Sequence, residues 1–185
     1  MLARVLTGTV RQAIPTGGQL TLQSNPARPE FSDALVSVRV GADGRFQLPL
    51  PDRHRVSKLL VSFTDALSPD CRVNLNESRP QARHFAVETL LFYPTGSATP
   101  VYLLQKRPGA GERLKPGDYA VVYYYADLAS SATGTVTCPA YTMTLATHFA
   151  AGWNAVVYTV DAVSSTGEVT GFSLRTPRQL PPARF

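Results

Sequence analysis

A chain of 185 residues is long enough for one large β domain or two small ones packed together. Its 44% hydrophobic and 17% charged residues allow a normal core, and its 15 prolines indicate a loop-rich fold rather than a helical or disordered one. The net charge of +5 comes mainly from arginines that are scattered along the chain, which argues against a nucleic-acid-binding protein.

No apolar run is long enough to span a membrane, and the first residues lack the basic start and apolar centre of a signal peptide. We therefore expect either a cytosolic protein or a mature exported one whose signal, and any lipid anchor, lie outside this sequence. The low charge and β-rich composition favour export to the periplasm or cell surface.

The first 68 residues contain short runs of alternating apolar and polar residues that are typical of strands. Gly41-Ala-Asp-Gly44 predicts a tight hairpin between two of these runs. Residues 52–55 are expected to form a charged loop. The predicted strands are 6–10, 19–23, 34–40, 45–50 and 57–64.

Three motifs in this segment resemble the prealbumin-like modules of bacterial envelope proteins, which are similar to carboxypeptidase regulatory-like domains. The motifs are Gly8-Thr-Val10, Val36-Ser-Val38 and Asp43-Gly-Arg-Phe-Gln-Leu48. The resemblance implies a β-sandwich with a structural or adhesive role and transfers no catalytic residue.

Residues 68–80 are loop-like and mark the expected boundary between two halves. The central strand after this boundary is 119–126, which is apolar on both faces and therefore predicts an interior strand covered on both sides. Other strands are predicted over 85–93, 101–105, 135–137, 142–144, 152–160 and 169–174.

A second set of residues resembles a pattern in Deinococcus-like envelope proteins of the lipoprotein type. It consists of Tyr123, Tyr125, Ala126 and Asp127, then Gly134 and Cys138, then Leu145, Gly152, Trp153 and Asn154. This resemblance implies a location in the cell envelope rather than an activity.

The sequence predicts no catalytic, metal or cofactor site. His54, His84 and His148 lie far apart and are expected to be surface or half-buried side chains rather than zinc ligands. Cys71 and Cys138 also lie far apart. They would form a disulfide in an exported protein and would be two buried thiols in a cytosolic one.

The aromatic residues of the second half have two interpretations. Tyr123, Tyr124, Tyr125, Trp153 and Tyr158 supply either core packing or a surface on which a sugar or an apolar ligand stacks. Tyr124 points away from Tyr123 and Tyr125, so Tyr124 and Trp153 are the candidate ligand contacts. Small neighbours beside Trp153 predict that its ring is mostly buried.

These observations predict an all-β sandwich with little or no helix. A prealbumin-like half, 1–68, would pack on a second half, 69–175, followed by an extended Pro/Arg tail, 176–185, that frays or docks on a neighbour. The predicted function is a non-enzymatic scaffold or accessory subunit of an envelope complex. A carbohydrate- or ligand-binding module and a hydrolytic enzyme are the alternatives.

Overall fold

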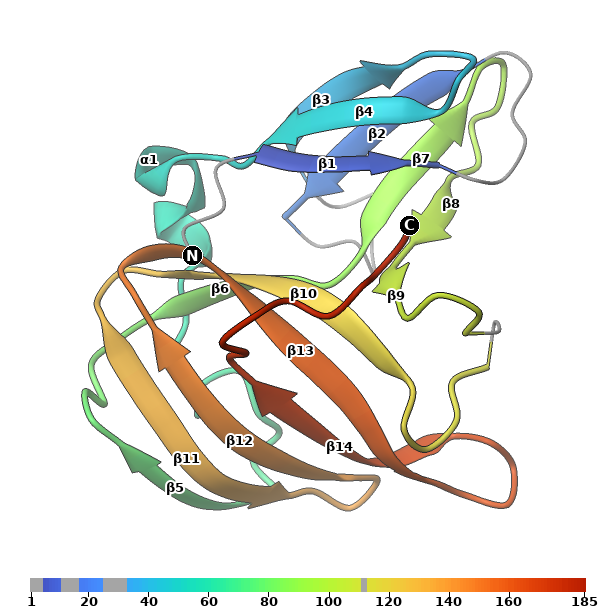
Figure 1. The fold of residues 1–185 in the computed structure, drawn as a ribbon. Coiled ribbons are helices and arrows are strands. Elements are labelled where there is room, and N and C mark those ends of the chain that lie inside the picture. Colours follow the sequence, from blue (N-terminus) through green and yellow to red (C-terminus); the bar gives the residue numbers. More distant parts are fainter. Residues whose placement is uncertain (1–4, 11–16, 25–32, 111–112) are drawn as a thin grey trace.

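The computed structural model describes residues 5–10, 17–24, 33–110 and 113–185, which form two β lobes stacked on each other (Figure 1). The described residues are mostly strand, with one short α-helix. The predicted all-β fold of packed sheets is therefore confirmed.

The small lobe, drawn mainly in blue, cyan and light green in Figure 1, holds two sheets. Gly44 adopts a φ of 73° and its N–H donates to the carbonyl of Gly41 over 3.0 Å, so the predicted hairpin is confirmed. One sheet pairs β1 (Val5–Thr9) with β4 (Arg45–Pro49), and the other has the order β3 (Ala34–Val40), β2 (Gly18–Gln23), β7 (Leu90–Pro94) and β8 (Val101–Leu103).

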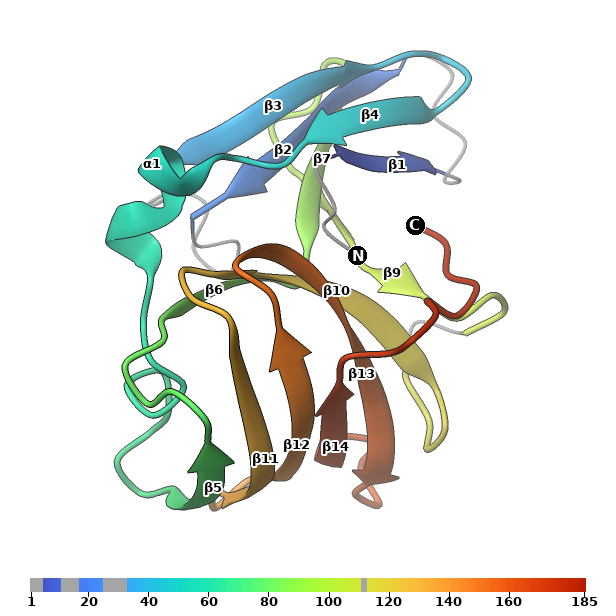
Figure 2. The ribbon, with the colours of Figure 1, turned by 60° about the vertical axis from the view of Figure 1, so that its left-hand side comes forward.

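The large lobe is one eight-stranded sheet, antiparallel except between β12 and β14. Figures 1 and 2 show that it curves, so that β6 and β10 turn across the ends of β11 and β12. Its order is β5 (Arg72–Glu77), β11 (Ser130–Thr137), β12 (Thr142–Phe149), β14 (Val169–Arg175), β13 (Gly152–Val163), β10 (Tyr119–Ala126) and β6 (His84–Val87), with β9 (Gln105–Lys106) also paired to β10.

Strand β10 lies between two hydrophobic cores, as predicted. Val121, Tyr123 and Tyr125 face the core shared with the small lobe, and Val122 and Tyr124 face a second core inside the curved sheet. Successive side chains of a strand point to opposite faces, so one run of alternating apolar residues serves both cores.

The segment after β4 is helical, which corrects two predictions. Residues 53–56 form α1 (Arg53–Val56) instead of a loop, because the Asp52 carboxylate accepts a hydrogen bond from the Arg55 N–H and caps the helix. A 3₁₀ turn, η2 (Ser57–Leu59), replaces the start of the predicted strand 57–64. From that stretch only Val61 makes a strand-like pair, with His84.

Two further predictions about strands are wrong. The predicted strand 85–93 is two strands, β6 and β7, because the chain crosses from the large lobe to the small one at residues 88 and 89. The predicted loop 68–80 contains β5, which pairs with β11 at the edge of the large sheet. Alternation along the chain does not reveal either event, since both depend on which distant strand is the partner.

The sheets also do not divide at residue 68, the predicted boundary between the halves. Strands β7 and β8 follow that residue in sequence but belong to the small lobe, where β7 pairs with β2. The small lobe is thus completed by residues from the predicted second half.

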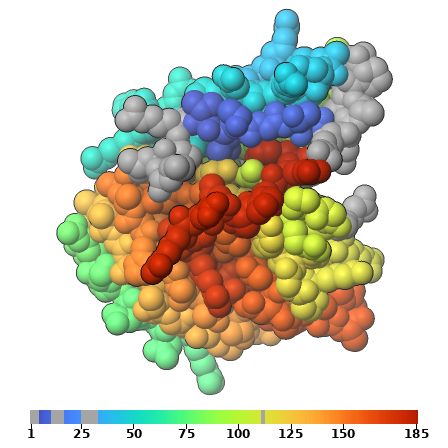
Figure 3. Space-filling model, in the orientation of Figure 1, coloured from blue at the N-terminus to red at the C-terminus, as the bar shows by residue number. Residues whose placement is uncertain are grey.

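The C-terminal tail docks on its own chain. Lys106 and Arg184 exchange two backbone hydrogen bonds of 2.8 Å, and the Tyr119 hydroxyl donates to the carbonyl of Pro182 over 2.8 Å. The Phe185 ring packs edge-on against Phe46, with ring centres 5.2 Å apart. Figure 3 shows the tail, in red, crossing this face from the large lobe to the small one.

No helix in the described part of the chain is long and apolar enough to cross a membrane.

Candidate functional site

A pocket of about 460 Å³ lies on the inner face of the curved sheet, under the segment that follows η2. Its volume is within the range of small-molecule sites. The segment contributes one wall of the pocket, formed by Val61, Ser62, Phe63, Ala66 and Leu67.

The opposite wall is built by the sheet. Tyr124 of β10, Tyr158 of β13 and Phe172 of β14 reach the pocket from three strands, and Met143 and Leu174 add apolar surface. These residues sit at positions that the strand pairing places on one face. Tyr158, for example, is opposite Leu174, and Met143 is opposite Phe172.

The aromatic rings around the pocket form two groups. In the first, Phe63 stacks near His84 with ring centres 4.4 Å apart, and Tyr124 lies 6.3 Å from Phe63. In the second, Phe172 stacks on Tyr158 at 4.8 Å and contacts Tyr141 at 5.4 Å. The pocket is therefore an aromatic space bounded by both groups.

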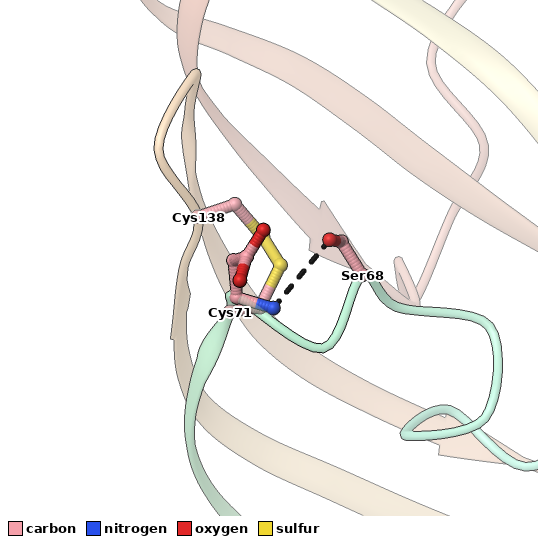
Figure 4. Close-up of a disulfide and its surroundings, with 4 residues drawn as sticks. Ser68, Cys71 and Cys138 are labelled. Atoms are coloured by element: carbon pink, nitrogen blue, oxygen red, sulfur yellow. Dashed lines mark hydrogen bonds between the residues drawn. A yellow bond between two sulfur atoms is a disulfide. The ribbon is translucent and has the colours of Figure 1, made fainter.

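The segment that covers the pocket is tied to the sheet at both ends. At one end Val61 and His84 exchange backbone hydrogen bonds of 3.0 and 2.7 Å. At the other a disulfide joins Cys71 to Cys138, whose Cα atoms are 4.2 Å apart (Figure 4). The carbonyl of Ser68 accepts a hydrogen bond from the Cys71 N–H close to this bond.

The pairing of Cys71 with Cys138 was one of the two outcomes left open by the sequence, and the structure shows it. The two residues are 67 positions apart, and closing a loop of that size stabilises a fold by about 4 kcal/mol. Cys138 directly follows β11 and Cys71 directly precedes β5, so the bond joins the neighbouring ends of two paired strands.

His84 is 5% exposed and lies between the rings of Phe63 and Phe149. Its Nε2 is 3.3 Å from the Ser130 hydroxyl, whereas no described group is within hydrogen-bonding distance of its Nδ1. Burial lowers the pKa of His84 from 6.5 to about 4, although the Asp127 carboxylate acts in the opposite direction. The imidazole is therefore neutral at pH 7.

The prediction of surface or half-buried histidines is wrong for His84, because Phe63 covers it from a distant part of the chain. It holds for His54 and His148, which are exposed.

Glu88 stands at the rim of the pocket, on the crossing between the lobes. Its side chain is exposed to solvent on one side, but the apolar groups around it raise the pKa of its carboxyl. Burial raises the pKa of Tyr158 to about 12, and the charges of Glu88 and Asp161 add to this effect. Burial and Glu88 also raise the pKa of Tyr124.

The structure does not bring together the two predicted ligand contacts. Tyr124 lines the pocket, although only 8% of it is exposed. Trp153 lies on the other face of the sheet, is 6% exposed, and donates from its indole N–H to the carbonyl of Pro51 over 2.8 Å. The expectation that Trp153 is mostly buried is confirmed.

Sequence reasoning did not identify most of the pocket. Phe63, Tyr141 and Phe172 reach it only because the covering segment and the curvature of the sheet bring them together. Glu88 did carry a signal, since it is the one charged residue in the run 85–93. A carboxylate within a mostly apolar run is expected either at the rim of a pocket or where one strand ends and the next begins. Glu88 occupies both positions.

The described residues contain no group of three or more His, Cys, Asp or Glu side chains that could hold a metal ion. Two other hollows, of about 580 and 520 Å³, lie on the small lobe on either side of Arg39. Most of their lining residues are exposed strand or turn positions, so they enclose a ligand less well than the covered pocket does.

Comparisons with protein-family models, with curated proteins and with solved structures find no match to this chain. The resemblances to prealbumin-like modules and to Deinococcus-like envelope proteins therefore stay predictions.

Proposed function

We propose that this protein is a non-enzymatic binding module of the bacterial cell envelope that holds a small, largely apolar molecule in the covered pocket. The observation that carries the proposal is a space of about 460 Å³ with aromatic and aliphatic side chains on both walls. A space of this size lined mainly by aromatic and aliphatic side chains is typical of small-molecule sites. A disulfide next to the pocket supports an oxidising compartment such as the periplasm or cell surface.

The hydrolase alternative has a specific weakness in this geometry. Ser130 and His84 form a serine–histidine pair beside the pocket, but among the described residues no carboxylate bonds to the His84 Nδ1 to orient the ring. A pKa of about 4 also makes His84 a weak base at neutral pH. This pair therefore supports a structural contact better than an activated nucleophile.

The carbohydrate alternative depended on an exposed aromatic ring. Trp153 is buried between the lobes, so a sugar does not reach its face without unfolding the contact with Pro51. The pocket favours an apolar ligand instead, because most of the surface that its walls expose is apolar.

A role as scaffold or accessory subunit of an envelope complex is a second candidate, favoured by two uncovered sheet edges. Tyr102 of β8 is 56% exposed and Val73 of β5 is 43% exposed, and both strands end their sheets. Co-purification from envelope membranes with and without a Tyr102→Lys change would test this role. Loss of a specific partner in the variant is expected if β8 forms the contact.

The binding proposal is tested with N-phenyl-1-naphthylamine, a neutral probe whose fluorescence rises in apolar surroundings. We expect saturable binding at one site per chain. Ala66→Phe should weaken it about tenfold or more, because Ala66 lines the pocket and a larger side chain there takes up part of the space. Thr64→Phe is the matched control, since Thr64 is exposed on the same segment and does not line the pocket.

If the probe does not bind, or if Ala66→Phe binds it as well as the parent protein does, the pocket is not a ligand site. If both variants weaken binding equally, the loss comes from disturbing the covering segment rather than from filling the pocket. This result also contradicts the proposal.

A further inference from the structure

The charge distribution around the pocket is uneven. Glu88 stands at the rim, and neither a lysine nor an arginine lines the space. In the described part of the chain no hydrogen bond or ion pair involves the Glu88 carboxylate. This site is thus locally acidic on a protein whose net charge is +5.

A second carboxylate, that of Asp161, lies outside the pocket lining and accepts a hydrogen bond from the Ser173 hydroxyl over 3.4 Å. Asp161, near the end of β13, and Glu88 both act electrostatically on the Tyr158 hydroxyl. The one histidine in the lining, His84, is neutral at pH 7 and does not offset them. An anionic ligand such as a fatty acid would meet the Glu88 carboxylate and neither a lysine nor an arginine in the lining.

The walls next to Glu88 are aromatic. Tyr158 and Phe172 are stacked at 4.8 Å, Tyr141 lies beside Phe172, and Tyr124 stands on the neighbouring strand β10. The faces of aromatic rings attract cations, most strongly where water is excluded, and cages of such rings bind quaternary ammonium groups. A nearby carboxylate adds a direct attraction between opposite charges. Both components are present here within one pocket.

We propose that the natural ligand is an organic cation, a quaternary or protonated amine whose apolar body fills the pocket while its charge lies between Glu88 and the tyrosine rings. The volume of about 460 Å³ is sufficient for a small aryl- or alkylammonium compound. This inference rests on the proposed binding function and specifies the class of ligand.

The test uses two compounds of the same shape, benzyltrimethylammonium and its uncharged carbon isostere neopentylbenzene. Each displaces N-phenyl-1-naphthylamine from the pocket in a competition titration at pH 7. We expect the cation to bind at least fivefold more tightly than the isostere, since only the cation gains from Glu88 and the ring faces.

Glu88→Gln should remove most of that preference while leaving the affinity for neopentylbenzene unchanged. Glu168→Gln is the matched control, because it removes the same charge from an exposed turn that does not line the pocket. A thermal melt of each variant confirms that it is folded before the titration.

Each outcome is decisive. Equal or tighter binding of neopentylbenzene overturns the cation inference but leaves the proposed binding function standing. The cation inference is also overturned if Glu88→Gln still binds the cation more tightly than neopentylbenzene. It is overturned too if Glu168→Gln removes this preference as completely as Glu88→Gln does. If N-phenyl-1-naphthylamine does not bind at all, the proposed function itself fails and the inference fails with it.

Discussion

The side chain of Trp153 contacts residues of both lobes. Its ring packs edge-on against Tyr125 at 5.5 Å and Phe85 at 6.2 Å, and its N–H donates to Pro51 of the small lobe. A buried indole needs a partner for this N–H, and the Pro51 carbonyl supplies it. The residue therefore serves packing between the lobes rather than ligand contact.

Replacing Trp153 with Ala should lower the free energy of unfolding by about 3–5 kcal/mol, because the change leaves a cavity between the lobes. Urea denaturation monitored by circular dichroism measures the loss. Trp153→Phe, which keeps much of the packing, should cost less. An alanine variant as stable as the parent would show that the ring is not part of the core.

His84 makes stability depend on pH. Its pKa is about 4 in the folded protein and near 6.5 in the unfolded chain. Between these values the unfolded chain binds a proton that the folded protein does not, so the free energy of unfolding falls as the pH is lowered through this window.

We expect His84→Phe to flatten this dependence by up to about 1.4 kcal/mol per pH unit, the value for one proton. Denaturation midpoints measured from pH 7 to pH 4 test it. His148→Phe is the control, since His148 is exposed on β12. Parallel pH profiles for the parent and His84→Phe would contradict the assignment.

The C-terminal tail is the element whose role differs most from the expectation. Its last residues lie against β9 and β1 rather than fraying. Gly8 of β1 makes room for this contact, since a Cβ at that position would come within 2.7 Å of the Phe185 ring. The tail therefore packs against the outer side of the core that the two lobes share.

Phe185→Ala should lower the free energy of unfolding by about 1 kcal/mol, as expected for a half-buried ring. Leu180→Ala is the matched control on the same tail, because Leu180 is 43% exposed and should contribute little. Thermal melts of both variants test this. If both melt like the parent, the docked tail does not stabilise the fold.

At the scale of the whole molecule, the two lobes share one core. The buried residues of this core come from β1, β2, β3, β4, β7 and β8 of the small lobe and from β6, β10 and β13 of the large one. The small lobe also takes β7 and β8 from beyond residue 88. Neither lobe is a continuous piece of chain.

A fragment of residues 1–68 is therefore expected not to fold alone. It lacks β7, the strand that pairs with β2, and it exposes the core face that Tyr123 and Trp153 normally cover. Circular dichroism and a denaturation curve of the fragment test this, with the full chain as reference. A cooperative transition in the fragment would instead support the division at residue 68 that the sequence favours.

Local patterns in the sequence were sufficient for much of the fold. Alternation identified most strands, two apolar faces identified β10 as interior, and Asp43-Gly44 identified the hairpin, because each depends on neighbouring residues only. Burial of Trp153 followed from its small neighbours in the same way. Of the pocket, Tyr124 was predicted as a ligand contact from its orientation opposite Tyr123 and Tyr125, and Tyr158 was named in the same aromatic cluster.

Pairing between distant segments decided the rest. The break at residues 88 and 89, the edge strand β5 and the Cys71–Cys138 bond each require knowing which remote strand lies alongside. The pocket exists because the segment after η2 folds over a curved sheet and covers His84 with Phe63. A period-two pattern records which face a side chain takes but not which segment covers that face, and that information is present only in the tertiary structure.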